Sequence, residues 1–229
     1  MTFLSDSKEI VLKLTALPKE WEAKAAILEM KAADYSHWKQ MEWIGFYFQY
    51  LCEKHLAGLV EMPGPKYGNV SFDGLYNRAW DFKAHAMNTS SHQLIVNDCE
   101  ATNRAVNDYG SVGLILAVGK VEYNDEARTF QNWHEELKGG KSDYERKRIE
   151  RGAWSRLRKV SFDLQQLSFI EITENTLRDC GSFQADFRNA DGSARRSKVM
   201  IDLEEINEEL KLVVDYKAEK PKLHKPLHY

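Results

Sequence analysis

Two acidic residues and a lysine lie close together in the stretch NVSFDGLYNRAWDFKAHA, which covers residues 69–86. Asp73 ends one apolar run of this stretch, and Asp81 and Lys83 fall within the next. Charged side chains avoid dry protein interiors unless they are paired or bind a metal ion. The stretch therefore indicates either a buried ion pair or a place where a cation and an anionic substrate are held.

The two apolar runs are typical of neighbouring strands in a β-hairpin. We expect residues 70–74 and 79–86 to form the strands, with Asn77 as the turn residue between them. Such a hairpin brings Asp73, at the end of one strand, near Asp81 on its neighbour. Two carboxylates side by side repel each other, which is costly unless a cation lies between them.

Magnesium is the cation that best suits this pair of acids. Mg²⁺ prefers oxygen ligands and commonly takes one or two carboxylates together with waters and substrate phosphate oxygens. Side chains two residues apart on a strand point to the same face, so Lys83 accompanies Asp81 while Phe82 faces the other side. We expect Asp73 and Asp81 to bind Mg²⁺, and the Lys83 ammonium to lie beside the attacking water or the phosphate.

The order Asp73…Asp81-Phe82-Lys83 resembles the Asp…(Asp/Glu)-x-Lys motif of the nuclease superfamily that contains most type II restriction endonucleases. The resemblance covers residues 36–121, as a helix, the motif hairpin and a long central strand. It implies an α/β fold of the restriction endonuclease type, with a central mixed β-sheet flanked by helices. It also implies Mg²⁺-dependent hydrolysis of double-stranded DNA at a specific site, with the two aspartates as metal ligands and the lysine as the third catalytic residue.

Two further residues are candidates for a supporting role in this site. Members of the superfamily often place a Glu on the helix before the hairpin, and Glu42 matches that description, with a solvated helix Glu as the alternative. His85 continues the face of Asp81 and Lys83, where it would touch the phosphate or accept a proton. A strand-end His bonded to the backbone is the alternative for this residue. The chain departs from the motif before the first acid, where Phe72 replaces the usual proline.

Residues 142–159 are rich in charged side chains, and we expect them to form a helix that is interrupted at Gly152. Arg side chains reach guanine edges in the major groove, and Lys and Arg neutralise phosphates, so this helix is a candidate DNA-binding face. A solvated helix with internal salt bridges is the alternative. The candidate DNA-binding residues are Arg146, Lys147, Arg148, Arg151, Arg156 and Arg158.

The composition favours one cytoplasmic domain. The chain has 229 residues and a formal net charge of -3, so any basic surface must be local. Its three cysteines have no metal-ligand spacing, which favours a reducing compartment over a disulfide framework. The apolar run VGLILAV is too short to cross a bilayer and the first residues do not resemble a signal peptide, so we expect no membrane partner.

The remaining pattern predicts a single domain over residues 1–216 and a flexible tail or arm at 217–229. The continuously apolar segment 111–125 is expected to be the central strand. Helices are expected at 18–33, 36–56, 127–138, 142–159 and 204–211, and further strands at 56–62, 93–98, 167–173, 182–188 and 197–203.

A homodimer is expected, because palindromic sites mirror the two-fold symmetry of a protein and two DNA strands need two active sites. Two other classes of function stay open. In a non-catalytic DNA-binding protein, the Asp–Lys cluster would be a structural ion pair. In an interaction module, the aromatic-rich helix 36–56 would carry the binding. Metal-dependent nicking of plasmid separates the nuclease from both, and a salt-sensitive gel shift separates the other two.

Overall fold

The computed structural model describes residues 2–62, 72–89, 92–124, 126–153, 155–180, 182–183, 192–194, 196–206, 211–216 and 223–224. Its helices are α1 (Phe3–Leu14), α2 (Ala23–Ala32), the 3₁₀ helix η1 (Ser36–Lys39), α3 (Trp43–Leu56), α4 (Cys99–Tyr109), α5 (Thr129–Leu137), α6 (Asp143–Glu150) and α7 (Glu174–Cys180). Its strands are β1 (Glu20–Glu22), β2 (Gly74–Tyr76), β3 (Arg78–Ala86), β4 (Gln93–Asp98), β5 (Val112–Tyr123), β6 (Lys159–Ile172), β7 (Ser182–Phe183), β8 (Lys198–Asp202), β9 (Lys211–Asp215) and β10 (Leu223–His224).

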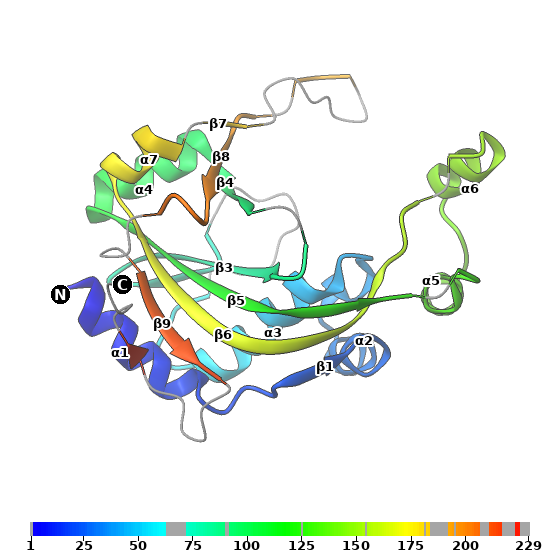
Figure 1. Ribbon diagram of the computed structural model, residues 1–229, viewed down its shortest axis with the longest axis horizontal. Helices are drawn as coiled ribbons and strands as arrows, with labels where there is room; N and C mark the ends of the chain where they lie inside the picture. Colours follow the sequence, from blue (N-terminus) through cyan, green and yellow to red (C-terminus); the bar gives the residue numbers. More distant parts are fainter. Residues whose placement is uncertain are drawn as a thin grey trace.

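A curled mixed sheet of seven strands forms the centre of the molecule (Figure 1). Its order is β10-β9-β6-β5-β3-β2, and β1 pairs with β6 off this path. β3 and β5 are parallel, and the other neighbours are antiparallel. β5 lies between β3 and β6 and is buried over its first six residues, which confirms the prediction of a central strand at 111–125.

Each face of the sheet packs its own hydrophobic core, and helices cover both (Figure 1). On one face, α1, α2 and α3 pack on side chains that include Trp80, Phe82 and Phe169. On the other face, α4 and the small sheet β4-β8-β7 pack on Leu114 and Leu116. The fold is therefore mixed α/β with a curled mixed sheet flanked by helices.

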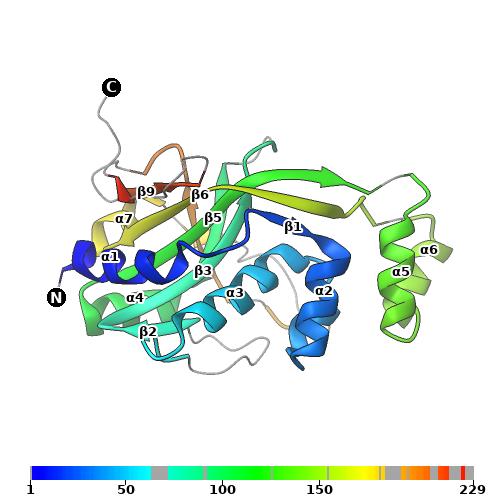
Figure 2. The ribbon, with the colours of Figure 1, turned by 90° about the horizontal axis from the view of Figure 1, so that it is seen from below.

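β5 and β6 run beyond the rest of the sheet and carry α5 and α6, as Figures 1 and 2 show. We call residues 124–158 the arm. The arm is held at α5, where the fully buried His134 ring has Nε2 2.9 Å from the Trp38 carbonyl and Nδ1 3.0 Å from the Met41 sulfur. At the base of the arm, the Trp43 indole donates to the Lys159 carbonyl at 2.8 Å.

The predicted helix 18–33 is wrong at its start, because Glu20–Glu22 form β1 and α2 begins at Ala23. Trp21 lies opposite Phe162 in the ladder to β6, and their rings stack with centroids 4.7 Å apart. Burial of this aromatic pair outweighs the helix propensity of the neighbouring residues. The predicted helix 36–56 is likewise broken at residues 40–42, which separate η1 from α3.

The predicted helix 142–159 is also wrong in its length, because α6 ends at Glu150. Gly152 follows with φ 68°, the left-handed conformation that commonly closes a helix, and the Ala153 N–H donates to the Arg148 carbonyl. The chain then returns through residues that belong to no helix until β6 begins at Lys159. Arg156 and Arg158 therefore lie on this return segment and not on α6.

The remaining predictions of turns, helices and strands are confirmed, partly formed, wrong or outside the described residues. Asn77 is the hairpin turn residue as predicted, with φ 56°, and the elements at 93–98, 127–138 and 197–203 are confirmed as β4, α5 and β8. Of the strand predicted at 56–62, one bridge forms, between Glu61 and Leu75. Residues 204–206 form no helix, and residues 184–188 and 207–210 lie outside the described residues. In the predicted tail, β10 pairs with β9, and the other residues of the tail lie outside the described part. No helix within the described ranges is long and apolar enough to cross a membrane.

A buried ion cluster fixes the first residue of β3. The Arg78 side chain is 7% exposed, with Nε 3.1 Å from Asp6 Oδ2 on α1 and Nη1 2.9 Å from Glu171 Oε1 on β6. The Ser111 hydroxyl donates to the same Glu171 oxygen at 2.8 Å. This cluster ties α1, β3 and β6 together at one end of the sheet.

Substitution of Arg78 tests this tie. Arg78→Ala would leave the fully buried Asp6 carboxylate without its counter-charge, and we expect a loss of about 3–5 kcal/mol in the free energy of unfolding at pH 7. Lys8→Ala, on the exposed side of the same helix, should change it by less than about 0.5 kcal/mol. Urea unfolding of both variants is the measurement, and equal stabilities would show that the cluster does not hold the sheet.

Candidate active site

The site lies at an edge of β3 that β2 does not cover. β2 pairs with β3 from Tyr76↔Arg78 to Gly74↔Trp80, while β3 continues to Ala86. Just before the first residue of β2, the Asp73 carboxylate accepts a hydrogen bond from the Phe82 N–H at 2.7 Å. The carboxylate thus takes the place that a carbonyl would fill in a longer strand.

A close packing contact fixes the backbone beside Asp73. A Cβ on Gly74 would lie 2.5 Å from Val60 Cγ1 and 3.2 Å from the Phe82 ring. Glycine at this position lets β2 lie directly on the core, so Asp73 is held in place by its neighbour as well as by its own hydrogen bond.

Asp81 and Lys83 share one face of β3, as the alternation of strand side chains predicts. Asp81 is 1% exposed, because its parallel neighbour is Leu114 and the α4 side of the sheet covers it. The Lys83 ammonium lies 2.8 Å from Asp81 Oδ2, and 29% of the lysine side chain is exposed. The lysine therefore pairs with a buried acid and also reaches solvent.

The electrostatics confirm that the two acids act on each other. Burial, together with the charge and hydrogen bonding of Asp73, outweighs the lowering effect of Lys83 and raises the pKa of Asp81 to about 7. Burial alone would lower the pKa of Lys83, but the charges of Asp81 and Asp73 raise it above its usual value. Lys83 is therefore an ammonium at neutral pH, and the two carboxyl groups compete for the charged state.

A third carboxylate approaches from the helix side. Glu53, the only acidic residue within α3, accepts a hydrogen bond from the Tyr35 hydroxyl at 2.9 Å. Burial raises its pKa, the Tyr35 hydrogen bond lowers it, and the charge of Asp73 raises it, which places Glu53 close to that residue. Sequence reasoning missed Glu53, although a lone acid in the last turns of the helix before the hairpin was the available signal.

The structure places Glu42 elsewhere. Glu42 stands at the N-terminus of α3, about 16 Å along the helix from Glu53 at the usual rise per residue. Its carboxylate forms an ion pair with Arg158 and lies 3.6 Å from Arg156. Glu42 thus belongs to the base of the arm, and Glu53 is the acid of α3 that interacts with Asp73.

His85 does lie on the face of Asp81 and Lys83, but among cations. Burial lowers its pKa, and the nearby Lys159 and His92 lower it further. A neutral imidazole with basic neighbours suits a contact with substrate phosphate. Nothing in the structure places it beside Asp73.

The donor set fits Mg²⁺. The candidate ligands Asp73 and Asp81 offer only carboxylate oxygens, which is the chemistry that Mg²⁺ prefers. The mutual repulsion of Asp73 and Asp81 is what a bound divalent cation would relieve. Within the described ranges, no three His, Cys, Asp or Glu side chains already form a metal-binding group. Mg²⁺ commonly takes only one or two protein carboxylates, with waters and substrate oxygens as the other ligands.

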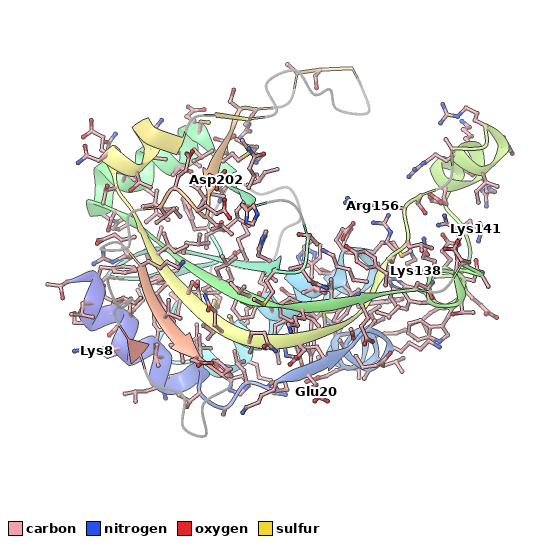
Figure 3. All side chains as sticks on the ribbon, viewed as in Figure 1. Lys8, Glu20, Lys138, Lys141, Arg156 and Asp202 are labelled. Carbon is pink, nitrogen blue, oxygen red and sulfur yellow. The ribbon has the colours of Figure 1, made fainter. Side chains whose placement is uncertain are left out.

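The predicted DNA-binding cations lie on the arm, where Figure 3 labels Arg156, and most of them are paired. Arg146 forms an ion pair with Asp143, and Arg148 lies 3.8 Å from Glu145. The Arg151 Nε donates to the Lys147 carbonyl at 3.1 Å. Arg156 and Arg158 share Glu42, as described above. Internal salt bridges, the alternative for this segment, are therefore present, while the Lys147 and Arg156 side chains stay exposed.

Comparison of the chain with protein-family models, with curated proteins and with solved structures finds no match.

The raised pKa of Asp81 predicts how stability depends on pH. Between the ordinary Asp value of 3.8 and about 7, the folded protein keeps a proton on Asp81 that the unfolded chain loses. Stability should therefore fall as pH rises through this window, with a limiting slope of about 1.4 kcal/mol per pH unit. Asp81→Asn should flatten this slope, whereas Glu20→Gln, at an exposed position, should not. Urea unfolding from pH 4 to pH 8 is the measurement, and an unchanged slope in Asp81→Asn would contradict the assignment.

Proposed function

We propose that the protein is a Mg²⁺-dependent endonuclease that hydrolyses phosphodiester bonds of double-stranded DNA at a specific site. The observation that carries the proposal is the meeting of the Asp73 and Asp81 carboxyl groups with the Lys83 ammonium at the open edge of β3. Glu53 adds a further carboxylate from α3.

The order of the elements supports a restriction endonuclease-like reading. Helix α3 precedes the hairpin of β2 and β3, and the chain then passes through α4 to β5, which lies parallel to β3. A helix, a motif hairpin and a central strand are the parts that the resemblance implies. The site also lies along the part of the β3 edge with which β2 does not pair.

The residues present would divide the chemistry among them. Asp73 and Asp81 would hold Mg²⁺, with the charge of Glu53 acting on Asp73 from the α3 side. When bound, this ion supplies polarisation of the phosphate and a lowered pKa for the attacking water. Lys83, held as an ammonium by the acids, donates hydrogen bonds to the attacking water or to a phosphate oxygen and stabilises developing negative charge. As an ammonium it acts by charge and position and not as a proton acceptor.

Hydrolysis of both strands of a duplex needs two such sites, so the proposal includes a two-fold symmetric dimer. The exposed Lys147 and Arg156 of the arm are the cations available for phosphate contacts. The proposal also includes a cytoplasmic location, because the three cysteines have no metal-ligand spacing and favour a reducing compartment.

A non-catalytic DNA-binding protein is the second candidate function. The observation in its favour is that Lys83 already pairs with Asp81 at 2.8 Å within one strand, as a structural ion pair would. The two candidates differ in what the lysine does for the protein, and substitution separates them.

Lys83→Ala should abolish metal-dependent cleavage while leaving the fold and DNA binding intact. Loss of one positioned electrostatic donor commonly costs about 10²–10³-fold in rate. Because Asp81 stays buried without its partner, we expect a loss of about 3–5 kcal/mol in stability with either role of Lys83. Plasmid nicking and a gel shift are therefore measured below the melting temperature of the variant, which thermal unfolding gives. A folded, DNA-binding variant that does not cut supports the catalytic role of Lys83, and one that cuts at the wild-type rate contradicts it.

Glu53→Gln should raise the Mg²⁺ concentration needed for half-maximal cleavage by roughly 10–100-fold, as loss of a group supporting a metal site does. Glu42→Gln is the matched control, because it removes the same charge from the other end of α3. We expect the control to cleave with the wild-type Mg²⁺ dependence. Equal effects of the two substitutions would show that Glu53 has no special place in the site.

A further inference from the structure

A pocket of about 440 Å³, lined by several charged side chains, opens at the base of the arm, away from the carboxylates of β3. It lies between the turn before α3, the end of α5, the start of α6 and the return segment to β6. Figure 3 labels two of its residues, Lys138 and Lys141, on the arm. The side chains that matter for its chemistry are Lys138, Lys141, Arg148, Arg158, Ser142 and Ser155.

The pocket carries more positive than negative charge. Four cations line it together with two carboxylates, Glu135 and Glu145. Glu135 forms an ion pair with Lys141, and Glu145 lies 3.8 Å from Arg148, so each acid already has a cation. The cations that remain, Lys138 and Arg158, have no carboxylate from the pocket lining as a salt-bridge partner among the described residues.

Lys138 is the first of these surplus cations. Its side chain is half-buried, and no salt bridge to it is found in the described part of the chain. Burial lowers its pKa, and Arg158 contributes to the lowering against the opposing charge of Glu135. A half-buried ammonium gains from a bound anion, which favours its charged form and replaces lost water.

Arg158 is the second surplus cation. Its Nη1 pairs with Glu42, but that carboxylate also serves Arg156, so one acid is shared by two guanidinium groups. Its Nε is buried and has no hydrogen-bond partner among the described residues. A buried donor without an acceptor is costly, and a ligand oxygen in the pocket would satisfy it.

Two hydroxyl groups complete the donor set. The Ser155 Oγ accepts hydrogen bonds from Gln131 Nε2 at 3.2 Å and from Arg128 Nη1 at 3.4 Å. The Ser142 Oγ accepts from the Glu145 N–H at 3.2 Å. Because both oxygens act as acceptors toward the protein, their own protons are left to donate to a ligand.

We propose that this pocket binds the phosphate group of a phosphate monoester, with room for a single nucleoside beside it. A monoester carries between one and two negative charges at neutral pH and three acceptor oxygens, which matches the two surplus cations and the two hydroxyl donors. The volume lies in the range of small-ligand sites and is too small for a duplex. The proposal does not depend on the nuclease activity, because no carboxylate of the β3 site lines the pocket.

The phosphate has two possible sources, a free nucleotide or the phosphorylated end of a nucleic acid strand. The probes are therefore AMP, adenosine, and a short single-stranded oligonucleotide with either a 5′-phosphate or a 5′-hydroxyl. Binding is measured by calorimetry on the full chain with EDTA present, so that no metal at the β3 site contributes.

AMP should bind and adenosine should not, and Lys138→Gln should weaken AMP binding at least tenfold. Lys138→Met removes the same charge but keeps the bulk of the half-buried side chain, and serves if the Gln variant unfolds. Lys8→Gln, at an exposed position of α1 outside the pocket, should keep wild-type affinity. Tighter binding of the 5′-phosphorylated oligonucleotide than of AMP identifies a strand end as the source, and the reverse identifies a free nucleotide. Equal binding of AMP and adenosine, no binding of any probe, or equal losses in Lys138→Gln and Lys8→Gln would overturn the proposal.

Discussion

The hydrogen bond from the Phe82 N–H to the Asp73 carboxylate is the interaction on which the candidate site depends. It exists because the pairing of β2 with β3 reaches no further than Gly74, the first residue of β2, while β3 continues. The side chain of the preceding residue, and not a strand, therefore bonds to that edge. This one contact draws a carboxylate onto the edge of a strand that already buries Asp81. The result is a local concentration of negative charge that the protein does not neutralise fully with Lys83. An arrangement that costs stability in the resting molecule indicates a purpose other than folding.

The rest of the fold keeps β3 rigid around this costly arrangement. At its first residue, Arg78 is fixed by acids from α1 and β6, and along its length β3 is paired with the buried β5. The two charged groups of β3 thus have opposite characters. Arg78, at the first residue of the strand, is buried and paired with two acids. Asp81 and Lys83 instead form a pair in which the lysine side chain is partly exposed to solvent.

Much of this site follows from local rules that a sequence displays. The alternation of strand side chains gives the shared face of Asp81 and Lys83, Asn77 gives the turn, and the unbroken apolar run gives β5 its central place. The position of Glu53 does not follow in the same way, because it depends on where α3 begins. The break at residues 40–42 moves Glu42 to the start of the helix and leaves Glu53 beside the hairpin.

The arm shows the same limit of local reasoning. The charged residues after Ser142 favour a helix, yet Gly152 closes α6 and the long antiparallel ladder between β5 and β6 claims the residues from Lys159 onward. β1 is a third case, where the stacking of Trp21 on Phe162 decides a strand within a segment of strong helix formers. For β1 and β6, a contact between residues distant in sequence sets the bounds of the element, whereas α6 ends at a local glycine cap.

The central claim is that Asp73 and Asp81 hold a divalent cation, and calorimetric titration with Ca²⁺ tests it without relying on cleavage. Ca²⁺ takes the same oxygen ligands as Mg²⁺. We predict one Ca²⁺ site per chain in the wild-type protein. Its Ca²⁺ affinity should be at least tenfold weaker in Asp73→Asn and unchanged in Glu42→Gln. Wild-type protein that binds no Ca²⁺ even with a DNA duplex present, or Asp73→Asn that binds as tightly as wild type, would contradict it.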